Sequence, residues 1–178
     1  MMSIVYVFWM YVCLFAVIGW MRGWAKELLV AFSVILSLAL NHVIRKYIPL
    51  AASLAETDKS LFWVRAIILV VLVYFGYQTV ISIPHLVSRS SAARERLQDT
   101  LFGAFLGALN GYLVAGSILY YIHIAEYPFE AVIAKPTDAD LVNTVNQMML
   151  YMPPHLLGEP GIYFAIILAF VFVLVVYI

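Results

Sequence analysis

The residues best suited to chemistry in this sequence are its four histidines, and their spacing argues against a shared site. His42, His85, His123 and His155 each fall near the end of a different apolar segment. A histidine in a membrane helix can ligate a haem or chlorin through one ring nitrogen, and His42 and His123 are the candidates. Since no two histidines share a helix at ligand spacing, we expect no cofactor and no metal site.

Other reactive groupings are not apparent. The sequence has no clustered Ser, His and Asp set, no phosphate-binding loop and no metal-ligand spacing. The polar candidates inside apolar segments are Gln78, Thr79, Ser82 and Asn110. A transporter usually has a broken helix or a polar cluster at the membrane midplane, whereas we expect these four to make hydrogen bonds between helices. The sequence therefore predicts a protein that is not an enzyme.

The clearest pattern is a row of glycines at intervals of four residues. Gly103, Gly107 and Gly111 follow this spacing, and Gly19 and Gly23 repeat it earlier in the chain. Residues four apart lie on one helix face, where glycine lets a second backbone approach closely. We expect these glycines to pack helices within this chain, and the alternative is a face for a dimer or a membrane partner.

A charged motif lies next to the first glycine pair. Arg22 and Lys26 are one helical turn apart and Glu27 follows. We interpret them as anchors at the membrane interface, with the two basic side chains directed at lipid phosphates. The alternative is an ion pair between this turn and the later charged stretch that carries Arg96 and Asp99.

Composition indicates which elements must position these residues. The 178 residues are 65% hydrophobic and 11% charged, with a mean hydropathy of +0.99. That is too little charge to cover a soluble domain, so the main partner is membrane lipid. Ten basic side chains balance ten acidic ones, and this balance gives no indication of nucleic acid binding.

The hydropathy pattern predicts an all-α polytopic membrane protein with four to five transmembrane helices. A span needs about 20 apolar residues. The predicted spans are 3–21, 28–44, 61–83 and 101–124, and a fifth at 161–178 is barely long enough. The first two must turn within 22–27, which predicts a tight hairpin. Trp20, Trp24, Trp63, Tyr120 and Tyr121 lie at span ends, as in interfacial aromatic belts.

An extramembrane loop, 126–160, should contain a short amphipathic helix at about 138–152. Thr137 and Asp140 read as its capping box, and Pro153 ends it. We expect this helix to lie in the membrane interface, and the alternative is that its apolar face packs on the ends of the spans. Earlier in the chain, Thr57 or Asp58 should cap the third span.

Basic residues are divided equally between the two sides of the membrane. With the N-terminus outside, the inner turns hold Arg22, Lys26, Arg89, Arg94 and Arg96, and the outer ones hold Arg45, Lys46, Lys59, Arg65 and Lys135. The inner turns carry their charges more densely. This density favours the N-terminus outside.

These motifs, in this order, resemble the CvpA (colicin V production protein) family. The resemblance rests on the Gly19–Leu28 motif and on the later run from Arg96 and Asp99 through the three glycines, and it covers residues 1–125. It implies a bacterial inner-membrane protein of four spans with an envelope-related role. A similar module precedes an extracytoplasmic protease domain in some membrane proteases, which agrees with the N-terminus outside. Asn110 departs from the pattern, since family members often carry a base there, and nothing protease-like follows residue 125.

Three functions are compatible with these observations. The leading hypothesis is a non-enzymatic, CvpA-like scaffold or assembly protein that acts through helix packing with itself or with another membrane protein. The second is an accessory transmembrane subunit of a respiratory or photosynthetic complex, where a histidine could meet a pigment. The third is a small transporter or channel.

Overall fold

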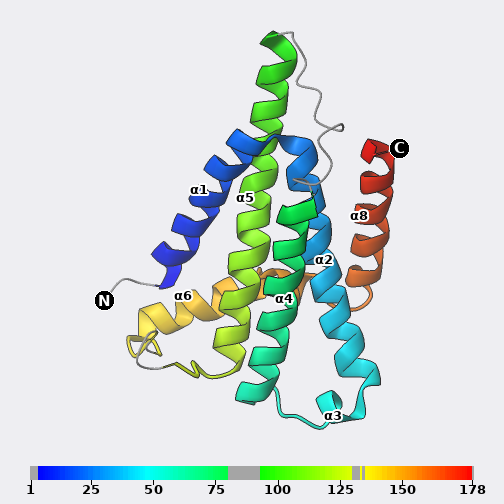
Figure 1. The fold of residues 1–178 in the computed structure, drawn as a ribbon. Helices are drawn as coiled ribbons and strands as arrows, with labels where there is room; N and C mark the ends of the chain where they lie inside the picture. Colours follow the sequence, from blue (N-terminus) through cyan, green and yellow to red (C-terminus); the bar gives the residue numbers. More distant parts are fainter. Residues whose placement is uncertain (1–3, 80–92, 130–132, 134, 178) are drawn as a thin grey trace.

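The computed structural model describes residues 4–79, 93–129, 133 and 135–177, and every regular element within them is an α-helix. Four helices are long and apolar enough to cross a membrane: α1 (Ile4–Arg22), α2 (Trp24–Tyr47), α4 (Lys59–Thr79) and α5 (Ala93–Ile124). The structure therefore confirms the predicted all-α polytopic membrane protein. Successive long helices run in opposite directions (Figure 1).

Local sequence explains where these helices begin and end. Gly23 separates α1 from α2 with a φ of +87°, a backbone conformation that favours glycine. Ile48 is extended before Pro49, which ends α2 and begins the short helix α3 (Pro49–Ala52). The Asp58 carboxylate accepts the Ser60 N–H at 2.7 Å, so Asp58 caps α4 as one of the two predicted residues.

The helix α5 is the centre of the bundle and packs against α1, α2 and α4. Among the helices that the structure describes, α5 and α1 share the most extensive interface, whereas α1 and α2 touch little beyond their shared turn. The turn lies within the predicted 22–27 segment, but the predicted tight hairpin does not form, because α1 leans onto α5 instead. At 32 residues, α5 is about 48 Å long, and its first turns extend beyond the other helices (Figure 1).

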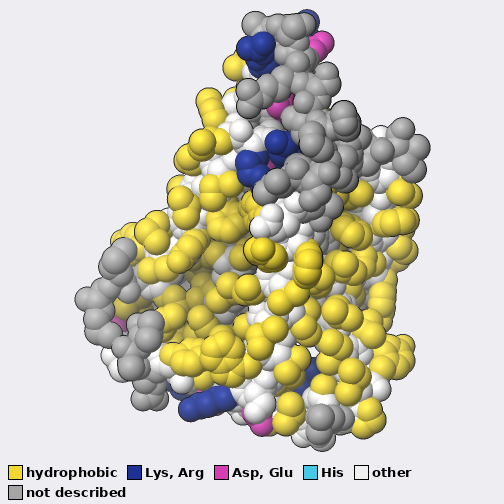
Figure 2. Space-filling model, in the orientation of Figure 1, with side chains coloured by type: hydrophobic (Ala, Val, Ile, Leu, Met, Phe, Trp, Pro, Cys, Tyr) yellow, Lys and Arg dark blue, Asp and Glu magenta, His cyan; other side chains and the backbone are white. Residues whose placement is uncertain are grey.

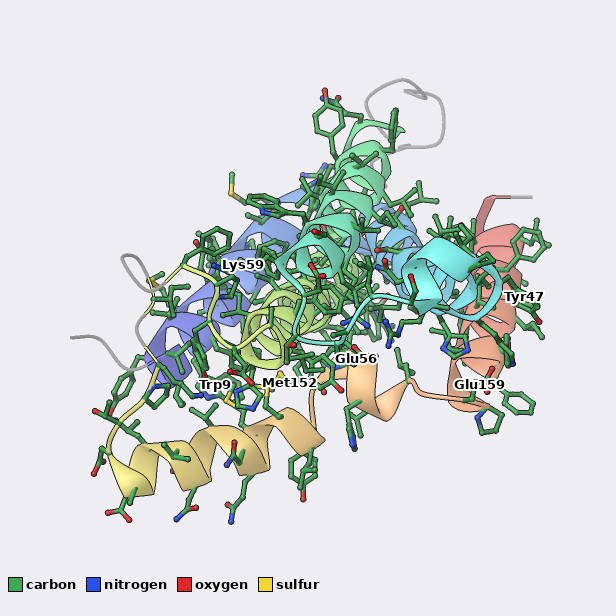
Figure 3. The ribbon with its side chains drawn as sticks, turned by 90° about the horizontal axis from the view of Figure 1, so that it is seen from below. Trp9, Tyr47, Glu56, Lys59, Met152 and Glu159 are labelled. Atoms are coloured by element: carbon green, nitrogen blue, oxygen red, sulfur yellow. The ribbon has the colours of Figure 1, made fainter. Side chains whose placement is uncertain are left out.

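The amphipathic helix α6 (Ala139–Leu150) crosses the lower ends of the long helices, followed by the short α7 (Pro153–Leu156) (Figures 1 and 3). Val145 and Met149 are buried in a cluster with Phe8 of α1 and Leu119 of α5. The apolar face of α6 thus packs on the spans, as in the alternative interpretation. The predicted capping box is wrong, because Asp138 is the N-cap and makes no side-chain capping bond.

The last helix, α8 (Gly161–Tyr177), lies along α2, where the rings of Phe32 and Phe170 are 6.2 Å apart. It has 17 residues and is shorter than the four spans, so its crossing of the membrane stays a prediction.

Apolar side chains cover the middle of the molecule, with Lys and Arg towards both ends (Figure 2). Trp20, Trp24 and Trp63 are exposed near helix ends, as expected for an aromatic belt. Tyr121 is 4% exposed and belongs to the core, so its predicted place in the belt is wrong.

Candidate functional site

Glu27, in the first turn of α2, is completely buried, and it is the one charged side chain among the buried polar residues that the structure describes. Its Oε1 atom lies 3.0 Å from Arg22 Nη1, and its Oε2 accepts a hydrogen bond from Asn110 Nδ2 at 2.8 Å. The same amide nitrogen also donates to the Glu27 carbonyl at 2.9 Å. Glu27 is therefore the centre of a buried cluster, and its carboxylate is covered by protein groups where the sequence predicted an anchor open to the membrane interface.

Arg22 reaches this cluster from the last turn of α1. Its guanidinium carbon lies 4.2 Å from the Tyr77 ring centroid, and Nη2 donates to the Tyr77 carbonyl at 3.4 Å. The Arg22 side chain is only 20% exposed, so it points inward and not to lipid phosphates as predicted. We call Arg22, Glu27, Tyr77 and Asn110 the helix junction, because they join α1, α2, α4 and α5.

Asp99 makes a second connection between α5 and the turn at Gly23. Its Oδ1 atom accepts the Trp24 N–H at 3.1 Å, so a carboxylate from α5 serves as the cap that Gly23 cannot supply to α2. A Cβ on Gly23 would lie 2.7 Å from both Asp99 oxygens. The charged turn at 22–27 and the later charged stretch at 96–99 do meet. The contact that joins them is the hydrogen bond from the Trp24 backbone to Asp99. Lys26 is half-buried and Arg96 is exposed.

The glycines lie where α1 and α5 cross. A Cβ on Gly19 would overlap the Gly103 carbonyl and lie 2.7 Å from Gly107 Cα. At Gly111, an added Cβ would lie 2.8 Å from Phe15 Cβ. The row of glycines therefore contacts α1 of the same chain, backbone against backbone. This close crossing brings Arg22 and Asn110 within reach of one carboxylate.

The buried polar side chains continue along the contact between α2 and α5. Ser37 and Asn41 on α2, and Ser117 on α5, are all buried. Asn41 Nδ2 donates to Tyr121 Oη at 3.5 Å, and Ser117 Oγ donates to the Leu113 carbonyl at 2.6 Å. The bond from Asn41 therefore joins α2 to α5, whereas Ser117 bonds within its own helix.

A second charged cluster lies at the opposite end of α2. Glu159 Oε1 is 2.6 Å from Lys46 Nζ, 2.7 Å from His42 Nε2 and 2.8 Å from Tyr163 Oη. We call these four residues the Glu159 cluster. It ties the start of α8 to the end of α2, and Figure 3 shows Glu159 on the same side of the bundle as Tyr47. Hydrogen bonds from Lys46, Tyr163 and His42 lower the pKa of Glu159 to about 2.

The two candidate cofactor ligands both contact protein groups. His42 belongs to the Glu159 cluster, and His123 Nδ1 lies 3.2 Å from Tyr127 Oη. His155 is exposed, and His85 lies outside the described residues. No group of three or more potential metal ligands occurs in the part of the chain that the structure describes.

Of the polar span residues, Asn110 bonds α2, whereas Gln78 donates to Tyr74 Oη of its own helix at 3.1 Å. The side chain of Thr79 and all of Ser82 lie outside the described residues.

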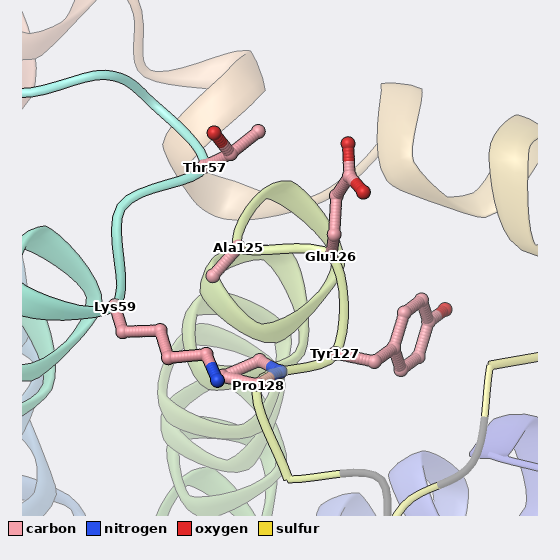
Figure 4. Close-up of a pocket in the computed structure, with 6 residues that line it drawn as sticks. All are labelled: Thr57, Lys59, Ala125, Glu126, Tyr127 and Pro128. Atoms are coloured by element: carbon pink, nitrogen blue, oxygen red, sulfur yellow. The ribbon is translucent and has the colours of Figure 1, made fainter.

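An open pocket lies at the lower end, between the start of α4 and the end of α5. Thr57, Lys59 and Glu126 contribute polar side chains to its lining. The Lys59 side chain extends towards Pro128, whereas Glu126 points away from it (Figure 4). The two charged groups therefore do not converge on a common point, and the helix junction is the better candidate site.

Sequence reasoning missed Tyr77 and the partnership of Asn110 with Glu27. An Asn beside a row of glycines was the available signal, because a polar side chain on a closely packed face must find a partner on the facing helix. No comparable signal distinguishes Tyr77 from the other tyrosines.

Comparisons with known proteins identify the family. The protein-family model described as Colicin V production protein matches residues 4–150. The match extends past residue 125, where the resemblance was expected to end, and includes α6 but not α8. No curated protein matches the chain. No solved structure matches it either.

Proposed function

The chain belongs to the colicin V production protein family and is a multi-pass membrane protein, and we propose from this premise that it is a non-enzymatic scaffold or assembly protein. In this proposal it presents a rigid helical bundle whose outer faces contact a second membrane protein or a second copy of the chain.

The observation that supports this role most directly is the closed helix junction. Both carboxylate oxygens of Glu27 are occupied, by Arg22 and by Asn110, and the carboxylate has no exposed surface. A reactive carboxylate would need access to a substrate, whereas this one holds neighbouring helices in place. The glycines are likewise engaged inside the chain, so a partner would have to bind the outer helix faces.

Photo-crosslinking in native membranes tests the scaffold proposal. A photoreactive residue at Ile67, which is 55% exposed on α4, should yield a discrete crosslinked species larger than the monomer. The same residue at Leu69, which is 0% exposed on the same helix, should yield only monomer. Scanning exposed positions on α1 and α4 and recovering only monomer and lipid adducts would contradict the proposal.

We place the protein in the bacterial inner membrane with the N-terminus outside. The density of positive charge around Arg22 and at the start of α5 supports this orientation. In a Cys13→Ser background, a membrane-impermeant thiol reagent applied to cells with a permeable outer membrane should modify Ala55→Cys but not Gln98→Cys. The reverse labelling pattern would contradict the orientation.

A small transporter is the second candidate, because a buried ionisable residue in a membrane helix often belongs to an ion or proton pathway. Glu27 is such a residue. If this function holds, Glu27→Gln should abolish proton flux into proteoliposomes that carry a pH-sensitive dye. Equal flux in the wild type, the variant and protein-free vesicles would remove this candidate.

A further inference from the structure

Two buried polar atoms at the helix junction have no hydrogen-bond partner among the described residues. They are Asn110 Oδ1 and Tyr77 Oη. Asn110 is 0% exposed. Leaving such atoms without partners carries a substantial desolvation cost, and ordered water is the usual partner when protein groups are not in reach.

The orientation of the Asn110 amide is fixed by its neighbours. Nδ2 lies 2.8 Å from Glu27 Oε2 and 2.9 Å from the Glu27 carbonyl oxygen, both of which are acceptors. Exchanging the amide nitrogen and oxygen would direct Oδ1 at these two oxygens, with no hydrogen between them. Asn110 Oδ1 is therefore an acceptor that needs a donor.

Tyr77 Oη, at the same junction, is a hydrogen-bond donor that also has no partner within the part of the chain that the structure describes. Its ring stacks on Arg22, whose guanidinium binds Glu27, and Glu27 in turn binds Asn110. Phe15 provides a second link, because its ring centroid is 6.4 Å from that of Tyr77 and its Cβ packs at Gly111, next to Asn110. A donor and an acceptor that both lack partners thus belong to the same chain of side-chain contacts.

We propose that the helix junction binds a buried water molecule that accepts a hydrogen bond from Tyr77 Oη and donates one to Asn110 Oδ1. A water bridging two such groups spans about 4.5–5.5 Å between them. A neutral water suits this place better than a metal cation. The Arg22 guanidinium already balances the Glu27 charge and would repel a second cation. Such a water would be bound whether or not the protein acts as a scaffold.

Removing the Tyr77 hydroxyl distinguishes a bridged hydroxyl from an unsatisfied one. If it donates to bound water, Tyr77→Phe should lower the Tm in detergent by about 2–4 °C. If it has no partner, the same change should leave the Tm unchanged or raise it, because an unsatisfied buried group is removed. Tyr6→Phe, on the exposed face of α1, is the matched control and should not change the Tm.

A double-mutant cycle then tests whether Asn110 shares the water. The Tm loss on Tyr77→Phe should largely disappear when Asn110 is already replaced by Ala, because the water has lost one partner. Equal losses in both backgrounds would overturn the bridge between these two residues.

X-ray radiolysis in H₂¹⁸O detects the water without relying on the Asn110→Ala variant folding. Radicals formed from a bound water should label the Tyr77 ring, whose hydroxyl oxygen is buried, with ¹⁸O more than Tyr121, which is 4% exposed and whose hydroxyl accepts from Asn41. Labelling of Tyr77 no stronger than that of Tyr121 would overturn the proposal.

Discussion

The helix junction and the Glu159 cluster are both built around a glutamate that is paired with a basic side chain, and they differ in their exposure to solvent. At the helix junction, Glu27 is 0% exposed and its partner Arg22 is 20% exposed. In the Glu159 cluster, the Glu159 side chain is 41% exposed and Lys46 is 45% exposed. The ion-pair distances are similar, 3.0 Å and 2.6 Å, so distance does not separate the two clusters.

Solvent exposure changes how much each cluster contributes to the stability of the folded protein. A buried carboxylate that loses its cation remains uncompensated in a medium of low polarity, whereas an exposed one is rehydrated. The helix junction joins four helices inside the region that matches the family, and the Glu159 cluster joins α8, outside that region, to α2. We infer that the junction is essential to the fold of the bundle and that the Glu159 cluster adjusts the position of one helix.

The largest expected effect comes from removing the cation of the junction. Arg22→Ala should destabilise the bundle by about 3–5 kcal/mol, because Glu27 would be left as a buried, unpaired charge. Thermal unfolding in detergent measures the loss, with Lys46→Ala as the matched change in the Glu159 cluster. Similar Tm values for the two variants would contradict the difference between the clusters.

The next largest loss of stability should come from a substitution at the glycines where α1 and α5 cross. Gly19→Ala places a Cβ against the Gly103 carbonyl, so α1 and α5 must separate, at a cost of about 1–3 kcal/mol. At Gly161 of α8 an added Cβ would lie 3.6 Å from the nearest heavy atom, an ordinary contact, so Gly161→Ala should be tolerated. Unfolding measurements on both variants test this ranking, which fails if Gly161→Ala is the more damaging.

The cap that Asp99 supplies should have a smaller effect. Asp99→Ala removes the acceptor for the Trp24 N–H and should cost about 0.5–2 kcal/mol. Asp99→Asn retains an acceptor oxygen and should recover most of the loss, as measured by thermal unfolding. If Asp99→Asn and Asp99→Ala lower the Tm equally, the negative charge of Asp99 matters more than its hydrogen bond.

The smallest effect is expected from acidification of the Glu159 cluster. Because its partners lower the pKa of Glu159 from 4.5 to about 2, the carboxylate stabilises the docked α8 above pH 4.5. This contribution is lost as the pH falls from 4.5 through 2. A distance measurement between spin labels on α2 and α8 should show a pH-dependent change in this window that Glu159→Gln removes. The same change in the Gln variant would assign it to another group.

Much of this fold could be predicted because hydropathy dominates the sequence. The four spans, the turn near Gly23 and the cap at Asp58 follow from apolar run length, glycine conformation and local hydrogen bonding. The helix α6 was predicted within a few residues for the same reason, since Pro153 limits it and its apolar spacing is regular.

The junction could not be predicted in the same way, because it depends on which helices become neighbours. Glu27 lies beside charged residues at the edge of an apolar run, and this position suggests an interfacial anchor. Only the packing of α5 against α1 and α2 shows that Asn110, 83 residues from Glu27, contacts the same carboxylate as Arg22. Exposure of the Tyr121 ring was misjudged for the same reason, since the helix end it occupies is covered by packing.

The pairing of α1 with α5 also has a consequence for biogenesis. The helix α1 enters the bilayer before its main partner α5, and about 80 residues must be synthesised between Gly19 and Gly103. Until α5 is synthesised, Gly19 has no helix to pack against and Glu27 lacks its partner Asn110. We therefore expect bundle closure to be a late, post-insertion event, during which a half-assembled intermediate depends on the translocation machinery or on chaperones for protection.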